Sequence, residues 1–182
     1  MNKYLCGTIV LCLLAGLNRP QSLAQNGSAK PKESPAQVCF SKVKGLAGDW
    51  THNKDNTANA TIEMRYRLIS GGTAIEEIQA PDSPGGMTSI YHLDNGSLVM
   101  THYCSLGNQP HLKLTKGSTA SKMEFTCGGG GGNMKSENEI HVHNLVITFV
   151  SADHIIQEWS AYKEGKELGP ANKMDLYRKA SK

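Results

Sequence analysis

Histidines and cysteines spaced two residues apart on predicted β-strands are the side chains of this sequence best suited to chemistry. His102 and Cys104 form one such pair, and His141 and His143 form another. Successive side chains of a strand alternate between its two faces, so both members of a pair project to the same side. Cys127 ends a further strand-like run and is a fifth candidate ligand. Imidazole and thiolate groups suit Zn²⁺, copper or haem iron. The sequence requires no cofactor, but it gives a candidate metal set of His102, His141 and His143 for haem or Zn²⁺.

The same side chains have a simpler interpretation as parts of the fold. Histidines can hydrogen-bond inside a barrel, and cysteines can fill small apolar spaces. A β-bulge at Asn144 would also turn His141 and His143 outward, because the inserted residue changes the face on which the preceding residues lie. The orientation of these two histidines therefore stays open at the level of sequence.

The hairpin predicted over residues 87–104 positions His102. Asn95-Gly96 joins two strand-like runs and predicts a type I′ turn, because both central residues of that turn need positive φ. A two-residue turn places eight side chains on one face, and we expect that face to be buried. The expected pairs are Leu93 with Leu98, Tyr91 with Met100, Ser89 with His102, and Met87 with Cys104.

A binding site inside the fold follows from this face of the hairpin. His102 would be the polar group that orients a ligand among apolar neighbours. The next turn along the chain, at Asn108 and Gln109, would contribute from the rim. The candidate ligand-binding residues are Tyr91, Met100, His102, Cys104, Asn108 and Gln109, and the expected partner is a small hydrophobic or amphipathic molecule.

Short strand-like runs separated by turn residues fill the chain from residue 46 onward, whereas residues 38–44 suit a short helix or a single turn. The five glycines at 128–132 are interpreted as a flexible loop between two strands. This pattern predicts an all-β fold, a closed antiparallel up-and-down β-barrel of about 8–10 strands. Closure removes exposed strand edges, and a barrel of this size can hold one small ligand.

The turn after Val150 decides which side chain of the next strand enters the barrel. A three-residue loop opposes Phe149 to Ile155 and buries Trp159, and we favour it because it keeps Glu158 outside. A two- or four-residue loop would place Glu158 inside instead. Only in that case could Glu158 form an acid–base pair with His102.

The N-terminal residues predict export. Residues 1–24 contain Lys3, an apolar run over 4–17 and small residues at 22–24, which is the pattern of a secretory signal peptide. The run is shorter than the roughly 18 residues of a membrane span. Residues 25–37 are polar and rich in Pro and Ser, as in a disordered spacer. We expect a periplasmic or secreted protein with one barrel domain, residues 38–182, and no membrane span after cleavage.

The balance of acidic and basic residues narrows the classes of possible binding partner. All 16 acidic residues and all but two of the 19 basic residues follow residue 24, and no basic block stands out. This near balance argues against nucleic acid as a partner.

The cysteine positions argue against a disulfide framework. Cys104 and Cys127 are separated by a predicted strand, so they would lie about 10 Å apart, beyond the roughly 7 Å limit of a disulfide. Three thiols, Cys39, Cys104 and Cys127, are therefore expected to be reduced or variably paired.

The usual sequence signals of an enzyme do not occur. The chain has no Gly-x-Ser-x-Gly, no His-Glu-x-x-His and no phosphate-binding glycine loop that leads into a helix. These motifs would supply a nucleophile, a metal-bound water or an anion site. Their absence favours a binding protein over an enzyme.

Gly48-x-Trp50 on the first predicted strand resembles the Gly-x-Trp motif of the calycins, which include lipocalins, fatty-acid-binding proteins and nitrobindin-like barrels. The resemblance implies that the Trp packs at the closed end of the barrel against an Arg from the last strand, and Arg178 is the matching residue. Segments 91–110 and 145–159 are similar to a family of small secreted bacterial lipocalin-like proteins of unknown function. Nitrobindin-like relatives bind haem, although their haem-ligating motif has no counterpart placed on this chain.

Three functions remain open from the sequence. The first is an exported barrel that binds a small apolar or amphipathic molecule. The second is a metal- or haem-binding barrel, an enzyme or a sensor, that uses interior histidines. The third is an envelope interaction protein with a filled barrel and no ligand.

Overall fold

The computed structural model describes residues 32–55 and 57–180. The predicted signal peptide and most of the predicted spacer lie outside the described residues. The described chain begins with helix α1 and continues as strands joined by short connections. The elements are α1 (Pro35–Lys44), β1 (Gly48–Thr51), β2 (Met64–Ile69), the 3₁₀ turn η1 (Ser70–Gly72), β3 (Ala74–Gln79), β4 (Met87–Asp94), β5 (Ser97–Tyr103), β6 (Gln109–Leu114), β7 (Lys122–Gly132), β8 (His141–Phe149), β9 (His154–Lys163), β10 (Lys166–Glu167) and β11 (Asn172–Arg178).

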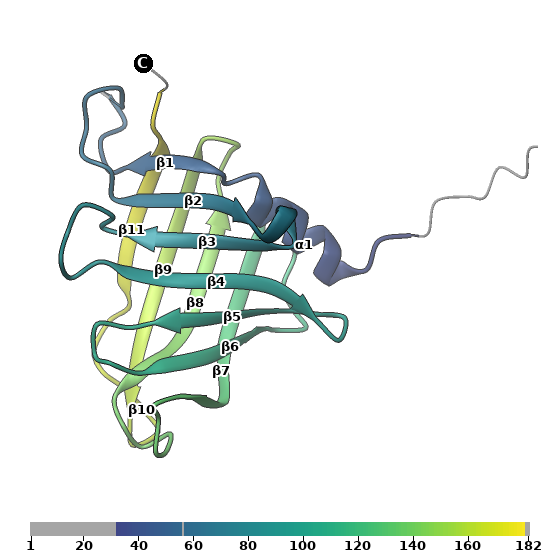
Figure 1. Ribbon diagram of the computed structural model, residues 1–182, viewed down its shortest axis with the longest axis vertical. Coiled ribbons are helices and arrows are strands. Elements are labelled where there is room, and N and C mark those ends of the chain that lie inside the picture. The colour runs from purple at the N-terminus through teal and green to yellow at the C-terminus, as the bar shows by residue number, and fades with distance from the viewer. Residues whose placement is uncertain (1–31, 56, 181–182) are drawn as a thin grey trace, which may run out of the picture. The chain divides into compact units, whose positions relative to one another are not determined.

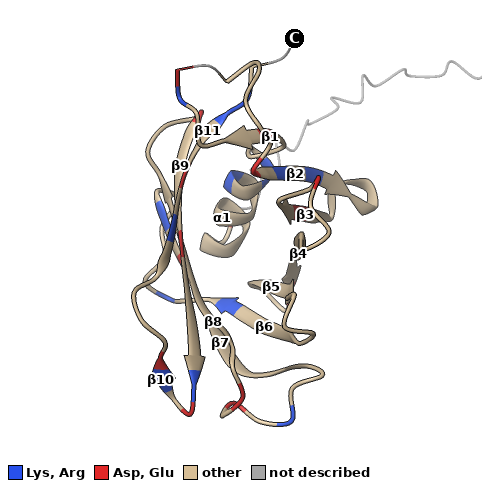
Figure 2. Cartoon of the chain, turned by 90° about the vertical axis from the view of Figure 1, so that its left-hand side faces the viewer, with Lys and Arg blue, Asp and Glu red and all other residues tan. Residues whose placement is uncertain are grey.

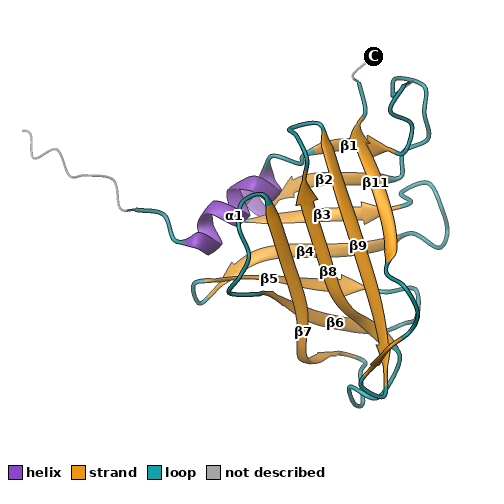
Figure 3. Ribbon diagram, turned by 180° about the vertical axis from the view of Figure 1, so that it is seen from behind, coloured by secondary structure: helices purple, strands orange, loops and turns teal. Residues whose placement is uncertain are grey.

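The strands form a closed antiparallel barrel, as the sequence predicts (Figure 1). Strands β1 to β9 pair in chain order, and β11 closes the ring by pairing with both β9 and β1. The short strand β10 pairs only with the end of β9, outside the ring (Figure 3). Closure leaves no long unpaired edge among the ten strands of the ring. This architecture is consistent with a calycin-like fold.

Helix α1 covers one end of the barrel (Figure 2). Ser34 caps the helix in a reciprocal pair of hydrogen bonds with Gln37, and Pro35 occupies its first turn. The inner face of the helix is buried, with Phe40 and Val43 at its centre. Residues 35–37, predicted as spacer, are therefore helical, because the Ser34–Gln37 capping box starts the helix three residues before the predicted domain boundary. α1 is too short to cross a membrane, and no other helix in the described residues is long and apolar enough to do so.

The β4–β5 hairpin has the predicted turn and register. Asn95 and Gly96 both have positive φ, at 45° and 77°. Three of the four predicted pairs form, namely Ser89 with His102, Tyr91 with Met100 and Leu93 with Leu98.

Two expectations for the hairpin ends are wrong. The β4–β5 ladder stops at Thr88 and Tyr103, so Met87 and Cys104 are not paired. Cys104 lies in the next turn, where its N–H donates to the carbonyl of Asn108, and its side chain is half-exposed. Leu93 is 36% exposed because it stands at the hairpin tip, beyond the barrel wall.

The β8–β9 register matches the favoured prediction. Phe149 opposes Ile155 and Leu145 opposes Trp159. Trp159 is buried, whereas Glu158 lies on the other face of the strand. The alternative pair of Glu158 with His102 inside the barrel does not form.

The glycine run is strand, not the predicted loop. β7 continues to Gly132, and Gly131 pairs with Pro110 across a register shift in β6. A Cβ atom on Gly131 would lie 2.4 Å from the carbonyl oxygen of Gln109. Glycine is therefore required here because the β6 backbone approaches too closely for any side chain.

The closed end contains the Trp–Arg contact that the calycin resemblance implies. Trp50 is fully buried, and its indole N–H donates to the carbonyl of Leu46. The Arg178 guanidinium lies 4.5 Å from the centre of the Trp50 ring and donates to the carbonyls of Ala47 and Gly45. Gly48 has a φ of 128°, and a Cβ atom there would lie 3.3 Å from Arg178 Nη1. These contacts tie the first strand, the last strand and the end of α1 together.

Candidate functional site

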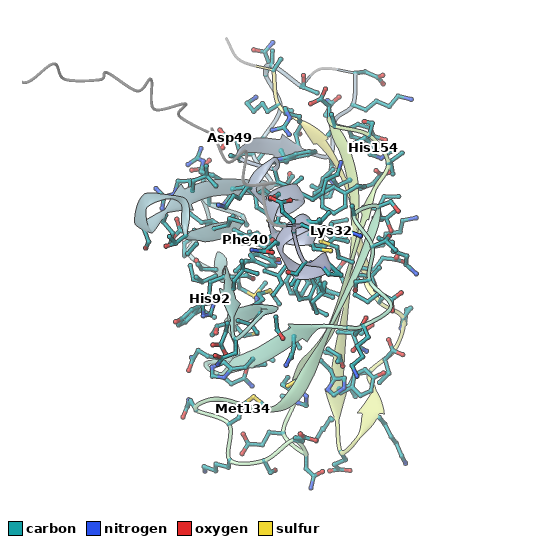
Figure 4. All side chains as sticks on the ribbon, turned by 90° about the vertical axis from the view of Figure 1, so that its right-hand side faces the viewer. Lys32, Phe40, Asp49, His92, Met134 and His154 are labelled. Atoms are coloured by element: carbon teal, nitrogen blue, oxygen red, sulfur yellow. The ribbon has the colours of Figure 1, made fainter. Side chains whose placement is uncertain are left out.

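Buried polar side chains occupy the barrel interior below the helix-covered end. Figure 4 views that covered end, with Phe40 of α1 at the front and Met134, in the loop after β7, at the lower edge. We call the opposite end, with its turns at residues 104–108 and 133–140, the distal end. The buried polar side chains are Thr51, Glu77, Gln79, Ser89, His102, Asn108, His141 and Gln157.

Glu77 is the centre of a hydrogen-bond network inside the barrel. Its carboxylate accepts from the hydroxyl of Tyr91 at 2.8 Å and from the side-chain amide of Gln157 at 2.9 Å. The same amide donates to the Tyr66 hydroxyl, and Trp159 donates to the amide oxygen of Gln157. Burial raises the pKa of Glu77, and these hydrogen-bond donors partly oppose that rise. Burial also raises the pKa of Tyr66 and of Tyr91 well above the usual value, so both hydroxyls remain donors.

His102 is a buried, neutral imidazole beside this network. Its Nδ1 lies 3.0 Å from the Ser89 hydroxyl, and its ring centre lies 5.0 Å from that of Trp159. Burial lowers the pKa of His102 to about 4, so the ring is uncharged at neutral pH. Within the described residues, Nε2 of His102 has no hydrogen-bond partner. This nitrogen is therefore available to a ligand.

The predicted ligand-binding residues divide into two groups. Tyr91, Met100 and His102 share the buried face of the hairpin. Asn108 is also buried and donates to the carbonyl of Ile140, but no described group donates to its own amide oxygen. Gln109 bonds instead to the carbonyl of Gly107 in its own turn, and Cys104 is half-exposed.

Cys127, His141 and His143 form a compact group that could hold a metal ion. One potential ligand atom from each of the three lies within 4.8 Å of the other two. Cys127 comes from β7, directly after the last paired residue of the β7–β8 ladder, and the histidines come from the start of β8. Cys127 and His141 are buried, and His143 is half-buried.

A register shift in β8 brings both histidines to this group. Val142 pairs with Ala161 and Asn144 pairs with Ser160, so His143 is the extra residue. A bulge at this place was expected to turn both histidines outward, but His141 is only 1% exposed. The extra residue instead lets two histidines separated by one residue contact each other.

Hydrogen bonds fix the ring orientation and proton position of His141. Its Nδ1 donates to the carbonyl of Glu139 at 2.8 Å, so Nε2 is the nitrogen directed at the site. Nε2 lies 3.0 Å from Nδ1 of His143, within hydrogen-bond distance. The His143 ring stacks on Tyr162 with centres 4.3 Å apart. Burial and the neighbouring His141 lower the pKa of His143, so this ring is also kept neutral.

The group fits a tetrahedral metal ion in its donor types and spacing. At Zn–N distances of about 2.0–2.1 Å and a Zn–S distance of about 2.3 Å, ligand atoms lie about 3.3–3.6 Å apart. The observed separations, from 3.0 Å between the two nitrogens to at most 4.8 Å, require only small side-chain shifts. A cysteine sulfur and two imidazoles suit Zn²⁺ or copper better than Mg²⁺ or Ca²⁺.

The structure brings together His141 and His143 of the predicted metal set, with Cys127 in the place of His102. Cys127, the fifth candidate ligand of the sequence, shares a face of β7 with Met123 and Phe125. The alternation of faces along β3 could have identified Glu77, because Glu77 shares the inner face of this strand with Ile75 and Gln79. The three cysteines of the described chain are free thiols.

Comparison of the chain with models of known protein families gives no matching family, and comparison with curated proteins gives no match. The resemblance to the calycins therefore rests on the barrel, which is consistent with a calycin-like fold, and on the contact of Arg178 with Trp50.

Proposed function

We propose that this protein is a metal-binding β-barrel that holds a transition-metal ion, with Zn²⁺ as the first ion to test, through Cys127, His141 and His143. The observation that carries the proposal is the group of three soft or borderline donors within 4.8 Å of one another. Nothing in the packing of an all-β barrel requires these three residue types to meet.

The surroundings of the group support metal ligation. Metal-binding histidines commonly donate their second ring nitrogen to a carbonyl or carboxylate, and His141 donates Nδ1 to the Glu139 carbonyl. Metal ligation requires neutral imidazole, and the lowered pKa of His143 favours that form. The bond from His143 to His141 would be replaced by two bonds to the ion.

The test is a Zn²⁺ titration against a competing chelator, repeated with Co²⁺ followed by absorption. We expect binding of one ion per chain and a sulfur-to-cobalt charge-transfer band. Replacing Cys127 with Ser or His141 with Gln should weaken binding by more than about 100-fold, since even residues that only support a ligand contribute about 10–100-fold.

The matched control is His111→Gln, which removes an exposed histidine from the outer face of β6. This variant should bind Zn²⁺ as the unaltered chain does. Equal loss in the control, or full affinity in the Cys127 variant, would contradict the proposal.

A small amphipathic ligand in the interior is a second candidate function, supported by the unpartnered Nε2 of His102. The ring is neutral, buried and oriented by Ser89, so it can give or accept one hydrogen bond. Native mass spectrometry of the isolated protein should show a bound mass that His102→Leu lacks. The exposed His92 provides the control variant His92→Leu. A bare chain mass would favour the third interpretation, a filled barrel that acts through its surface.

Export is part of the same proposal. The basic start, apolar run and small residues over 1–24 support it. N-terminal sequencing of the protein isolated from its source should begin at Gln25. A chain that retains Met1 would contradict export by cleavage.

A further inference from the structure

A divalent ion held by Cys127, His141 and His143 would carry an unbalanced charge. One thiolate and two neutral imidazoles leave a net charge of +1 on the complex. Cys127 is 8% exposed and His141 is 1% exposed, so this charge would be largely removed from water. Burying an unpaired charge is unfavourable, so a further anionic ligand would stabilise the bound ion.

Glu137 is the acidic side chain beside this group. It precedes His141 by four residues, and its Oε1 lies against the backbone of Gly129, two residues after Cys127. Within the described residues this carboxylate makes no hydrogen bond or ion pair, and the residue is exposed. The neighbouring Glu139 carboxylate instead accepts from the backbone N–H of Lys135. Glu137 therefore has a carboxylate free to bind a cation.

The glycine run at 128–132, at the end of β7, leaves space for the Glu137 carboxylate beside the site. Gly129, two residues after Cys127, has a φ of 85°. A Cβ atom at Gly129 would lie 2.1 Å from Oε1 of Glu137. Only glycine leaves room for the carboxylate against β7 at this point. The neighbouring Gly130 has open space where its Cβ would be.

The turn that carries Glu137 is anchored on both sides of this residue. The carbonyl of Ser136 accepts from the N–H of Glu139, and the carbonyl of Asn138 accepts from the N–H of Glu164. The backbone of Glu137 is thus held next to the start of β8, while its side chain stays free. The carboxylate lies outside the group of ligand atoms within 4.8 Å of one another, so a rotation of this free side chain would bring it to the ion.

We propose that the Glu137 carboxylate is the fourth ligand of the metal ion bound by Cys127, His141 and His143, which makes the site a closed one with no water on the ion. This inference rests on the proposed function. A closed four-coordinate site is typical of structural or storage sites, whereas catalytic zinc keeps one position for water. The ligand is therefore a divalent ion that the protein stores or uses to stabilise its structure, and the site does not catalyse hydrolysis.

The experiment measures Zn²⁺ affinity and the Co²⁺ absorption spectrum of the full chain and of Glu137→Gln. We expect the variant to bind at least about 10-fold more weakly, with a changed ligand-field band but an unchanged charge-transfer band from Cys127. The matched control is Glu139→Gln, which should keep both the affinity and the spectrum. Circular dichroism of each variant reports the fold.

A second pair of variants tests the role of the glycine run. Gly129→Ala should lower Zn²⁺ affinity as Glu137→Gln does, because its Cβ displaces the carboxylate, whereas Gly130→Ala should not. In the Glu137→Gln background, Gly129→Ala should cause no further loss.

Two results would overturn the inference in distinguishable ways. If the unaltered chain binds no metal, the proposed function and the inference fall together. If Glu137→Gln binds Zn²⁺ with unchanged affinity and an unchanged Co²⁺ spectrum, the metal site stands and the fourth ligand is water.

Discussion

Nε2 of His141 lies 3.0 Å from Nδ1 of His143, and one hydrogen joins the two rings. Nδ1 of His141 donates its hydrogen to the Glu139 carbonyl, so Nε2 is the nitrogen that faces His143. Burial and the neighbouring His141 lower the pKa of His143, and a metal ion can replace the hydrogen bond between the two rings.

The Zn²⁺ affinity should depend on pH in two stages. Zn²⁺ displaces the proton of its thiol ligand, so the affinity should fall as the pH falls, by up to about one log unit per pH unit. Protonation of His143 competes only at lower pH, because burial and the neighbouring His141 lower its pKa. The slope should therefore steepen below the usual histidine pKa of about 6.5, not at it. Titrations between pH 5 and 8 measure this, and steepening at pH 7 would contradict the assignment.

Replacing Glu77 with Gln should destabilise the barrel strongly. The amide oxygen of the new Gln can replace only one carboxylate oxygen, so its NH₂ would face either the Tyr91 hydroxyl and the Gln157 amide, which donate to Oε2, or the Gln79 amide, which donates to Oε1. We expect a loss of about 2–4 kcal/mol in the free energy of unfolding, since buried donors lose their acceptor. Urea unfolding followed by tryptophan fluorescence measures it.

The neighbouring residue provides the control for Glu77. Glu76 lies on the outer face of β3 and pairs with the exposed Arg67. Glu76→Gln should cost at most about 1 kcal/mol, as surface ion pairs do. Equal losses in the two variants would show that the Glu77 network adds nothing specific.

The sequence predicts the barrel, the hairpin register and the burial of Trp159 because these follow from strand parity. Parity is a local property, so it succeeds wherever a strand is regular. It leaves the orientation of His141 and His143 open, because a single extra residue in β8 interrupts the alternation of faces. It fails at Gly131, where the close approach of Gln109 from another strand decides that glycine belongs in a strand.

The candidate site was only partly predictable for a related reason. Cys127 and the two histidines lie on different strands, and their meeting depends on the end of the β7–β8 ladder. His102 faces the interior as its parity requires, but that interior is shared by several groups. Parity selects the face of a strand and not the neighbour across the barrel, so it placed His102 in the metal set.

The stability of the barrel should fall in acid through His102. Its pKa is about 4 in the folded chain and near 6.5 when unfolded, so the unfolded chain binds a proton first. Above pH 6.5 the neutral ring does not lower the free energy of unfolding, and the loss grows as the pH falls toward 4. Between pH 7.5 and 4.5 it amounts to about 2–3 kcal/mol. His102→Gln should lose that much less stability than the unaltered chain over this interval, as measured by urea unfolding. An identical pH dependence in both would contradict the burial of a neutral ring.

Arg178 should stabilise the fold by more than a positive charge at this position would, because the guanidinium also stacks and donates hydrogen bonds. The guanidinium stacks on Trp50, donates to the carbonyls of Ala47 and Gly45, and pairs with Asp153. Lysine keeps the charge but offers neither a planar face nor a fork of donors. We expect Arg178→Lys to cost about 1–3 kcal/mol in the free energy of unfolding, since the stacking and at least one hydrogen bond to a backbone carbonyl are lost.

The exposed Arg67 allows the same substitution without those contacts. Arg67 pairs only with Glu76 on the outer face of the barrel, so Arg67→Lys should change stability by at most about 0.5 kcal/mol. The two variants, unfolded in urea under the same conditions, differ in whether the arginine lies over a tryptophan and faces backbone carbonyls. If both lose the same small amount, the contact between Arg178 and Trp50 does not stabilise the closed end.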